Sequence, residues 1–387
     1  MTVKPVPTQK ASARARPPFE RIALVLQGGG ALGAYQGGVY QALSEAGIEP
    51  DWVAGISIGA INSAIIAGNA PERRVQALRS FWEKVSEPPL GVPNLPIKLD
   101  QLTHMMMNRT RAMGIMLFGA PGFFKPRFPS PAVYPFGGIE KLSYYDVTPV
   151  QETLESLVDF DRINAREMRL SVGTVNVRTG NFLYFDNAAD TITVRHVMAS
   201  GALPPGFPAI EIDGEYYWDG GIVSNTPLDW ILDSPDRKDS LIFQVDLWTA
   251  AGDLPRDLVE ADLRQKEIRF SSRTRLSTDR FRKAQMLRRA MCDLLAKLPP
   301  DLKQLRETEV LAAEADEKSY NIIELIYHSH NYEGTSKDYE FSRRTMEEHW
   351  TAGYNDTIRS LKHPEILQPS TGADGILTFD VARHGRH

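Results

Sequence analysis

Cysteine is nearly absent from this sequence, since Cys292 is the only one among 387 residues. A single cysteine excludes an intrachain disulfide bond and a metal site built from cysteine ligands. Disulfides belong mainly to oxidising compartments, so the low cysteine content favours a cytoplasmic location.

Long hydrophobic runs are absent as well. No stretch of about 18 uncharged apolar residues occurs, so the sequence predicts no membrane-spanning helix. The first twenty residues, MTVKPVPTQKASARARPPFE, contain four basic residues but no apolar segment, which excludes a secretory signal peptide. Their composition predicts a disordered basic leader over residues 1–20. A transit peptide is disfavoured because no amphipathic helix is evident.

Charge of one sign is not in large excess, because the formal net charge is −5 and the isoelectric point is near 6.0. Such a chain has no overall electrostatic attraction to nucleic acid, so we expect no nucleic-acid partner. A hydrophobic content of 42% is that of an ordinary globular protein, and the length is ample for a large buried core.

What is present from residue 21 to about residue 250 is an alternation of strand-like and helix-like segments. The runs WVAGIS (residues 52–57) and LIFQVDLW (residues 241–248) resemble buried strands, and helices are expected after Ser57 and near Pro71, Thr148 and Thr193. This alternation predicts an α/β fold with a mainly parallel central sheet and helices on both faces.

Residues 87–136 interrupt the alternation with many prolines, methionines and phenylalanines. Long irregular segments of this composition serve as lids or binding loops, so we predict a lid-like insertion within the 21–250 domain. An insertion with its own small core is the other interpretation, and the sequence does not favour either one.

The composition after residue 250 becomes highly charged and typical of helices, which predicts a charged helical region over residues 251–368 and a disordered tail over residues 369–387. Between Arg264 and Arg289 there are ten basic and two acidic residues around a loose apolar stripe. A packed helix with a solvated basic face is the favoured interpretation, and peripheral membrane contact through residues 264–289 is the alternative.

A glycine-rich turn follows the first predicted strand. In RIALVLQGGGALGAYQGG, Gly28, Gly30 and Gly33 spell the G-x-G-x-x-G pattern of dinucleotide sites. A dinucleotide site also requires an acidic residue at the end of the second strand, and Asp51 instead precedes that strand. The free N–H groups of such a turn, at the start of a helix, bind any anion, including a tetrahedral oxyanion.

The second motif is Gly55-Ile-Ser57-Ile-Gly59, a G-x-S-x-G sequence between a predicted strand and an apolar helix. This is the pattern of a nucleophile elbow, which exposes the serine hydroxyl on a sharp turn. A nucleophilic serine needs a base, yet only His196 of the eight histidines lies within the α/β segment, and we expect it to be structural. A metal pair at His328 and His330 is disfavoured because no acidic or cysteine partner is near in the sequence.

The other candidate base is Asp219, which follows the strand-like run Tyr216 to Trp218 and precedes Gly220 and Gly221. Taken alone, Asp-Gly-Gly would be interpreted as a hairpin turn. The glycine turn, the G-x-S-x-G motif and Asp-Gly-Gly occur together in this order, however. With the segments ASGALPPGFP and SNTPL (residues 224–228), they resemble the patatin-like phospholipase family over roughly residues 21–248.

The resemblance implies a three-layer α/β fold and hydrolysis of lipid acyl esters by a Ser–Asp dyad, with Ser57 as nucleophile and Asp219 as base. It also implies that backbone N–H groups of Gly28, Gly29 and Gly30 form the oxyanion hole and that no metal or organic cofactor is needed. The motif glycines are Gly33, Gly55, Gly59, Gly220 and Gly221.

The sequence departs from the family at Leu32, where members often have a basic residue, and this departure disfavours a strongly anionic headgroup. The expected substrate is therefore a lipid or simpler ester. The alternative function is a catalytically silent lipid-binding or membrane-binding protein on the same fold, and a dinucleotide-binding enzyme is the minor alternative.

Overall fold

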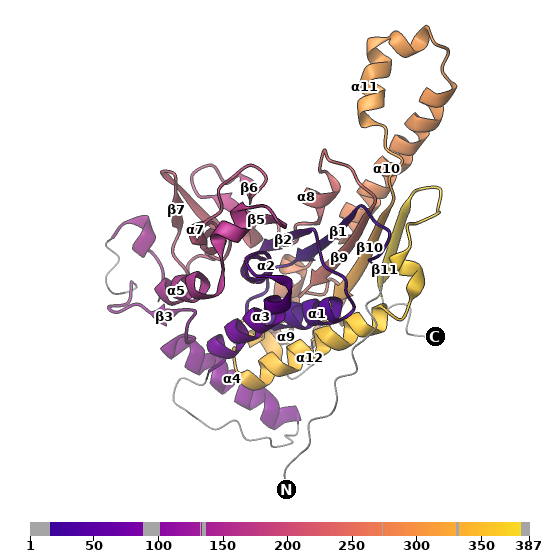
Figure 1. Ribbon diagram of the computed structural model, residues 1–387. Helices are drawn as coiled ribbons and strands as arrows, with labels where there is room; N and C mark the ends of the chain where they lie inside the picture. Colours follow the sequence, from indigo (N-terminus) through magenta and orange to yellow (C-terminus); the bar gives the residue numbers. More distant parts are fainter. Residues whose placement is uncertain are drawn as a thin grey trace.

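The computed structural model describes residues 16–87, 101–131, 133, 137–272, 274–329 and 333–380 (Figure 1). Most of the predicted basic leader and part of the 87–136 insertion lie outside the described residues.

A central sheet organises the described residues, and it contains nine strands in the order β11-β10-β9-β1-β2-β5-β8-β7, with β6 also paired to β5. The pairs from β11 to β5 are all parallel, whereas β6, β7 and β8 pair antiparallel at one end. The strands are β1 (Arg21–Leu26), β2 (Trp52–Ile56), β5 (Arg169–Asn176), β6 (Phe182–Asp186), β7 (Ile210–Ile212), β8 (Glu215–Asp219), β9 (Ser240–Asp246), β10 (Tyr320–Ile326) and β11 (Ile376–Asp380). A separate antiparallel pair joins β3 (Lys125–Pro126) to β4 (Tyr145–Asp146).

Helices cover both faces of this sheet. They are α1 (Ala34–Glu45), α2 (Ile58–Ala67), α3 (Pro71–Val85), α4 (Gln101–Phe118), α5 (Thr148–Leu157), α6 (Phe160–Asn164), α7 (Val194–Ser200), α8 (Leu228–Leu232), α9 (Leu258–Phe270), α10 (Thr274–Lys297), α11 (Arg306–Glu314) and α12 (Arg343–Ser360). Short 3₁₀ helices are η1 (Gly30–Gly33), η2 (Ile139–Lys141), η3 (Gly220–Ile222), η4 (Leu302–Gln304), η5 (Gly334–Ser336) and η6 (Pro364–Leu367).

The alternation of side chains along β1 shows how the layers form. Ile22, Leu24 and Leu26 belong to a large core cluster with residues of α1, α2, α3 and α12. Ala23 and Val25 point to the other face, into a smaller cluster with residues of α8 and α10. Because both faces of a parallel sheet are buried, its strands are mainly apolar, as β1 is after Arg21. The predicted α/β fold with helices on both faces is confirmed.

The region after residue 250 requires a correction. It is mainly helical, but it also contributes β10 next to β9, and β10 is almost entirely buried. Residues 376–380, which the sequence placed in a disordered tail, form β11 beside β10. The sequence analysis missed both strands because each is only five to seven residues long and lies among highly charged segments.

Helix α12 joins this region to the rest of the fold by packing along α1 (Figure 1). A Cβ added at Gly38 would lie 1.9 Å from the carbonyl oxygen of Trp350, and one at Gly353 would lie 2.0 Å from that of Tyr35. The two helix backbones therefore approach closely, and Trp350 is fully buried between them. The region from 251 to 380 is thus built into the sheet and its helical layer.

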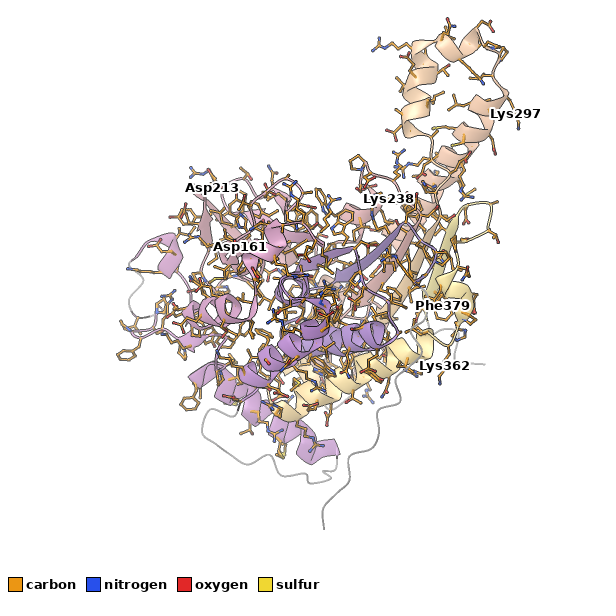
Figure 2. The ribbon with its side chains drawn as sticks, viewed as in Figure 1. Asp161, Asp213, Lys238, Lys297, Lys362 and Phe379 are labelled. Carbon is orange, nitrogen blue, oxygen red and sulfur yellow. The ribbon has the colours of Figure 1, made fainter. Side chains whose placement is uncertain are left out.

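Helices α10 and α11 form a hairpin that projects from the body, and Lys297 lies near its far end (Figures 1 and 2). Within the described segments, no helix is both long and apolar enough to cross a membrane.

Candidate active site

The glycine turn begins where β1 ends. The N–H of Gly28 donates to the carbonyl oxygen of Asn225 at 3.2 Å, and the carbonyl of Gly28 accepts from Asn225 Nδ2 and Trp248 Nε1, each at 3.0 Å. In the described part of the chain, the N–H groups of Gly29 and Gly30 have no acceptor. These two donors, and not that of Gly28, are therefore free to bind an anion at the start of η1 and α1.

Buried amide side chains hold this turn from behind. The Gln27 side chain accepts from the N–H of Leu247 at 2.6 Å and from that of Trp248 at 3.0 Å. Gln36 Nε2 donates to the carbonyl of Gln27 at 2.7 Å, and Asn62 Nδ2 donates to Gln36 at 2.8 Å. Since each amide is satisfied, the network fixes the direction of the glycine N–H groups.

Ser57 lies on the sharp turn between β2 and α2, with φ of 57° and ψ of −124°. A side chain in this left-handed region is strained, which is typical of a nucleophile elbow. The turn needs glycine on both sides, because an added Cβ at Gly55 would lie 2.2 Å from the Gly59 carbonyl oxygen and one at Gly59 2.2 Å from that of Leu26. The N–H of Ser57 donates to Ser200 Oγ at 3.1 Å, which fixes the turn to α7.

Asp219 ends β8, which pairs with β5, and β5 also pairs with β2, the strand that leads to Ser57. Its carboxylate accepts from the N–H of Gly221 at 2.7 Å and lies near the Ser57 hydroxyl, and both groups favour its ionised form. Asp219 is almost completely buried. Burial raises the pKa of this carboxyl group from 3.8 to about 7, although the Ser57 hydroxyl and the Gly221 N–H act in the opposite direction.

The two side chains share a pocket of about 410 Å³ that the three turn glycines also line. Most of the remaining wall is apolar and aromatic, and it includes Ile58, Ile61, Ile115, Met116, Phe123, Phe124, Phe207, Trp248, Phe270 and Phe341. Phe124 packs against Tyr145, Phe207 and Phe341, with ring centroids 4.7–6.3 Å apart. A pocket with this lining suits a hydrocarbon chain next to a small polar centre.

One wall of the pocket comes from the region after residue 250, which the sequence left without a role. The carbonyl oxygen of Asp338 accepts from the N–H of Ala31 at 2.8 Å and closely approaches Gly30. Tyr339 and Phe341 follow it into the pocket. No local motif marks these residues, so sequence analysis had no signal for them.

Other candidate residues lie outside this pocket. His196 is in α7, where its ring nitrogen contacts the N–H and hydroxyl of Thr193 in a capping box, and its ring packs on Phe185. Leu32 is fully buried in the main core cluster, so a side chain at this position does not line the pocket. His330 lies outside the described residues, and no cluster of three metal-binding side chains occurs among the residues that are described.

The position of Asp51 separates the two interpretations of the glycine pattern. Asp51 lies at the amino end of β2, where its carboxylate accepts from the N–H of Ile22 at 2.7 Å and pairs with Arg16. The glycine turn lies at the carboxyl end of the neighbouring parallel strand β1. Asp51 and the glycine turn therefore lie at opposite ends of these parallel strands, which disfavours a dinucleotide site.

Comparison with known proteins gives matches on both sides of residue 250. A family model described as patatin-like phospholipase matches residues 24–230, more than half of the chain, and one described as patatin phospholipase matches residues 268–372. The lysophospholipase nte1 of Aspergillus terreus is 55% identical over 49 residues, which are 13% of this chain and only 3% of that protein.

Two solved structures show low similarity. VipD from Legionella pneumophila is 18% identical, with a TM-score of 0.38 over 90% of this chain and 67% of that chain. The ExoU–SpcU complex from Pseudomonas aeruginosa is 20% identical, with a TM-score of 0.27 over 70% of this chain and 55% of that chain. TM-scores this low support no inference about this chain, and its fold is described from its own sheet topology.

Proposed function

Because the chain belongs to the patatin-like phospholipase family, we propose that it is a serine acyl hydrolase that cleaves the carboxylic ester bonds of lipids. The observation that carries this proposal is that Ser57, the buried Asp219 and the glycine turn line one pocket whose remaining walls are mostly apolar.

In the proposed reaction, Ser57 Oγ attacks the ester carbonyl carbon while Asp219 accepts the hydroxyl proton. The oxyanion that forms is bound by the N–H groups of Gly29 and Gly30. The C–O bond to the leaving alcohol then breaks, and Asp219 returns the proton to that alcohol. A water molecule, deprotonated by Asp219, then attacks the acyl carbon. The bond from this carbon to Ser57 Oγ breaks, Asp219 returns the proton to Ser57 Oγ, and the fatty acid is released.

The raised pKa of Asp219 suits this role. A carboxylate of ordinary pKa near 3.8 is a weak base, whereas one near 7 is matched to proton transfer at neutral pH and is still ionised in half or more of the molecules at pH 7 and above. No step of the proposed reaction calls for a metal or organic cofactor.

The pocket and the family together favour a phospholipid, a lysophospholipid or a neutral glyceride as substrate, of which the acyl chain would occupy the aromatic wall. Because the nte1 relative is named a lysophospholipase, a lysophospholipid is the first substrate to test. We also propose a cytoplasmic enzyme that meets its substrate at a membrane, and residues 264–289 remain one candidate for that contact.

The test is covalent labelling of the purified protein with a fluorophosphonate, together with hydrolysis of p-nitrophenyl esters and lysophospholipid. Wild type should be labelled and active, while Ser57→Ala should show no labelling and Asp219→Asn should lose activity by about 10³-fold or more. His196→Ala is the matched control and should remain labelled, because this histidine lies outside the pocket.

A silent lipid-binding protein would show a different result. Wild type would then bind lipid but hydrolyse none of the esters and take no label at Ser57. Equal loss of activity in His196→Ala, with Asp219→Asn still active, would contradict the proposed pair instead.

A further inference from the structure

Helix α4 carries apolar side chains on its solvent-facing side, which is unusual for a surface helix. Its buried side holds Asn108, Ala112 and Ile115, at helical spacing. Exposed large apolar side chains of α4 are Met106, Met113, Met116, Leu117 and Phe118. Leu117 and Phe118 are 65% and 63% exposed, so the last turn of the helix presents hydrocarbon to solvent.

Neighbouring segments extend this apolar surface. The Tyr145 hydroxyl donates to the Met116 carbonyl at 3.0 Å, which ties the end of α4 to β4. Phe128, which follows β3, is 99% exposed, and β3 pairs with β4. Tyr144 donates its N–H to Pro205 at 3.1 Å, close to the exposed Leu203. We call the exposed side chains of Met116, Leu117, Phe118, Phe128, Tyr144 and Leu203 the mouth surface.

The mouth surface is continuous with the pocket that contains Ser57. Met116 and Leu203 are both exposed to solvent and line the pocket. Ile115, the neighbour of Met116, lines the pocket from the buried side of α4. Apolar side chains therefore connect the mouth surface with the lining of the pocket that contains Ser57.

We propose that the mouth surface is the site at which the protein docks on a lipid bilayer or micelle. Grouped exposed apolar side chains mark an interaction site, and a lipid surface is the partner that also delivers the substrate to this pocket. Leu117, Phe118 and Phe128 insert among the acyl chains, and the substrate moves directly from the lipid phase to Ser57. This inference rests on the proposed function, because docking would deliver the lipid substrate. Its test does not depend on that function, since vesicle binding is measured without hydrolysis.

The projecting α10–α11 hairpin fits the role less well. Two cations of the 264–289 stretch are held within the protein, since Arg282 pairs with Asp374 at 3.2 Å and Arg289 donates to the Glu317 carbonyl at 2.9 Å. The exposed Leu294, Leu302 and Val310 lie farther along the hairpin, none of them lining the pocket. A bilayer bound there would not meet the mouth of the pocket.

The experiment compares two triple variants in the Ser57→Ala background, which prevents vesicle hydrolysis during binding. One carries Leu117→Gln, Phe118→Gln and Phe128→Gln in the mouth surface. The matched control carries Leu294→Gln, Leu302→Gln and Val310→Gln in the hairpin. Binding is measured by co-sedimentation with phosphatidylcholine vesicles at low and high salt, and thermal unfolding of each variant verifies that it is folded.

The mouth variant should bind vesicles at least about tenfold more weakly than its parent, whereas the control should bind as its parent does. Binding of the parent should change little with salt, because apolar insertion is not screened. With Ser57 restored, the mouth variant should lose hydrolysis of vesicle phospholipid but keep hydrolysis of a soluble short-chain ester.

Three outcomes would overturn the docking site. The first is unchanged vesicle binding by the mouth variant. The second is loss of binding by the hairpin variant, with a strong dependence of binding on salt. The third is a dimeric wild type that the mouth substitutions dissociate, which would make the surface a contact between copies. Failure of the proposed hydrolysis appears separately, as wild type without activity on the soluble ester, and leaves the binding comparison intact.

Discussion

The Asp219 carboxylate lies almost completely out of solvent at the end of β8, where it accepts from the Gly221 N–H and lies near the Ser57 hydroxyl. Desolvation disfavours the charged form, and this effect outweighs the opposite effect of these two polar groups. Burial at this position thus raises the pKa of Asp219 to near neutral pH.

The pH dependence of the reaction should follow from this shift. Because the pKa in the folded protein is raised to about 7, Asp219 is protonated below that pH and cannot accept the Ser57 proton. We expect kcat/KM for a soluble ester to rise with pH through a midpoint near 7 and to fall about tenfold per unit well below it. The measurement is a pH–rate profile between pH 5 and 9. A profile with its midpoint near 4 would mean that Asp219 is not the base or is not buried in solution.

The Gly30 backbone is the second feature that matters at the scale of single residues. Its φ is 55°, and an added Cβ would lie 2.1 Å from the Asp338 carbonyl oxygen. Gly30→Ala should therefore displace the proposed oxyanion donors and reduce kcat by about 10²–10³-fold, with a smaller change in KM.

The control for this substitution is Gly180→Ala. Gly180 has a similar φ of 70° but open space around its Cα, in a turn outside the pocket. The Gly180→Ala variant should lose some stability, because alanine is strained at a positive φ, and should keep the kcat of wild type. Equal kcat values for Gly30→Ala and wild type would exclude this turn as the oxyanion hole.

At the scale of elements, the contact between α1 and α12 decides how the last third of the chain is held. The two helices meet backbone to backbone at Gly38 and Gly353, and the Trp350 indole donates to Gln41 at 2.7 Å. Glycine at these positions allows an approach that any larger residue would prevent.

Gly38→Ala should accordingly destabilise the protein by about 1–3 kcal/mol, because its Cβ would have to displace the Trp350 carbonyl of α12. Chemical denaturation measures the change in the free energy of unfolding. Gly114→Ala in α4 is the control, since no atom lies within 4 Å of its added Cβ. It should be neutral or gain up to about 1 kcal/mol from the better helix propensity of alanine. Equal effects of the two substitutions would contradict the close packing of α1 on α12.

At the scale of the whole molecule, residues beyond 250 complete the sheet, one helical layer and the pocket. Without them, β9 would become an exposed edge strand, α1 would lose its partner α12, and the Asp338–Phe341 wall would be missing. Exposed apolar edges of this kind lead to aggregation.

A chain that ends at residue 250 should therefore be aggregated or unfolded and show no ester hydrolysis. Replacement of residues 291–315 by a short Gly-Ser linker is the control, because Arg289 already lies within hydrogen-bond distance of Glu317. This variant lacks the outer part of the projecting hairpin and should keep the activity of wild type. Circular dichroism, thermal unfolding and a soluble ester assay measure both. A folded, active 1–250 chain would establish the later region as a separate domain.

The sequence by itself determined the features that are local. The strand–turn–helix order around Gly28–Gly30 and around Ser57 is encoded in short apolar runs and in glycines that the turns require, and the parallel α/β architecture follows from their alternation. The resemblance to the family supplied the pairing of Ser57 with Asp219, which no spacing along the chain reveals.

Only the tertiary structure decided the features that depend on residues far apart in the sequence. The Gly28 N–H is occupied by Asn225 almost two hundred residues later, and the turn is covered by Asp338, which no motif marks. The strands β10 and β11 are short and lie among highly charged segments of the sequence. They are recognised only from the sheet that they join. The basicity of Asp219 has the same origin, because burial is a property of the folded chain and not of any local stretch of it.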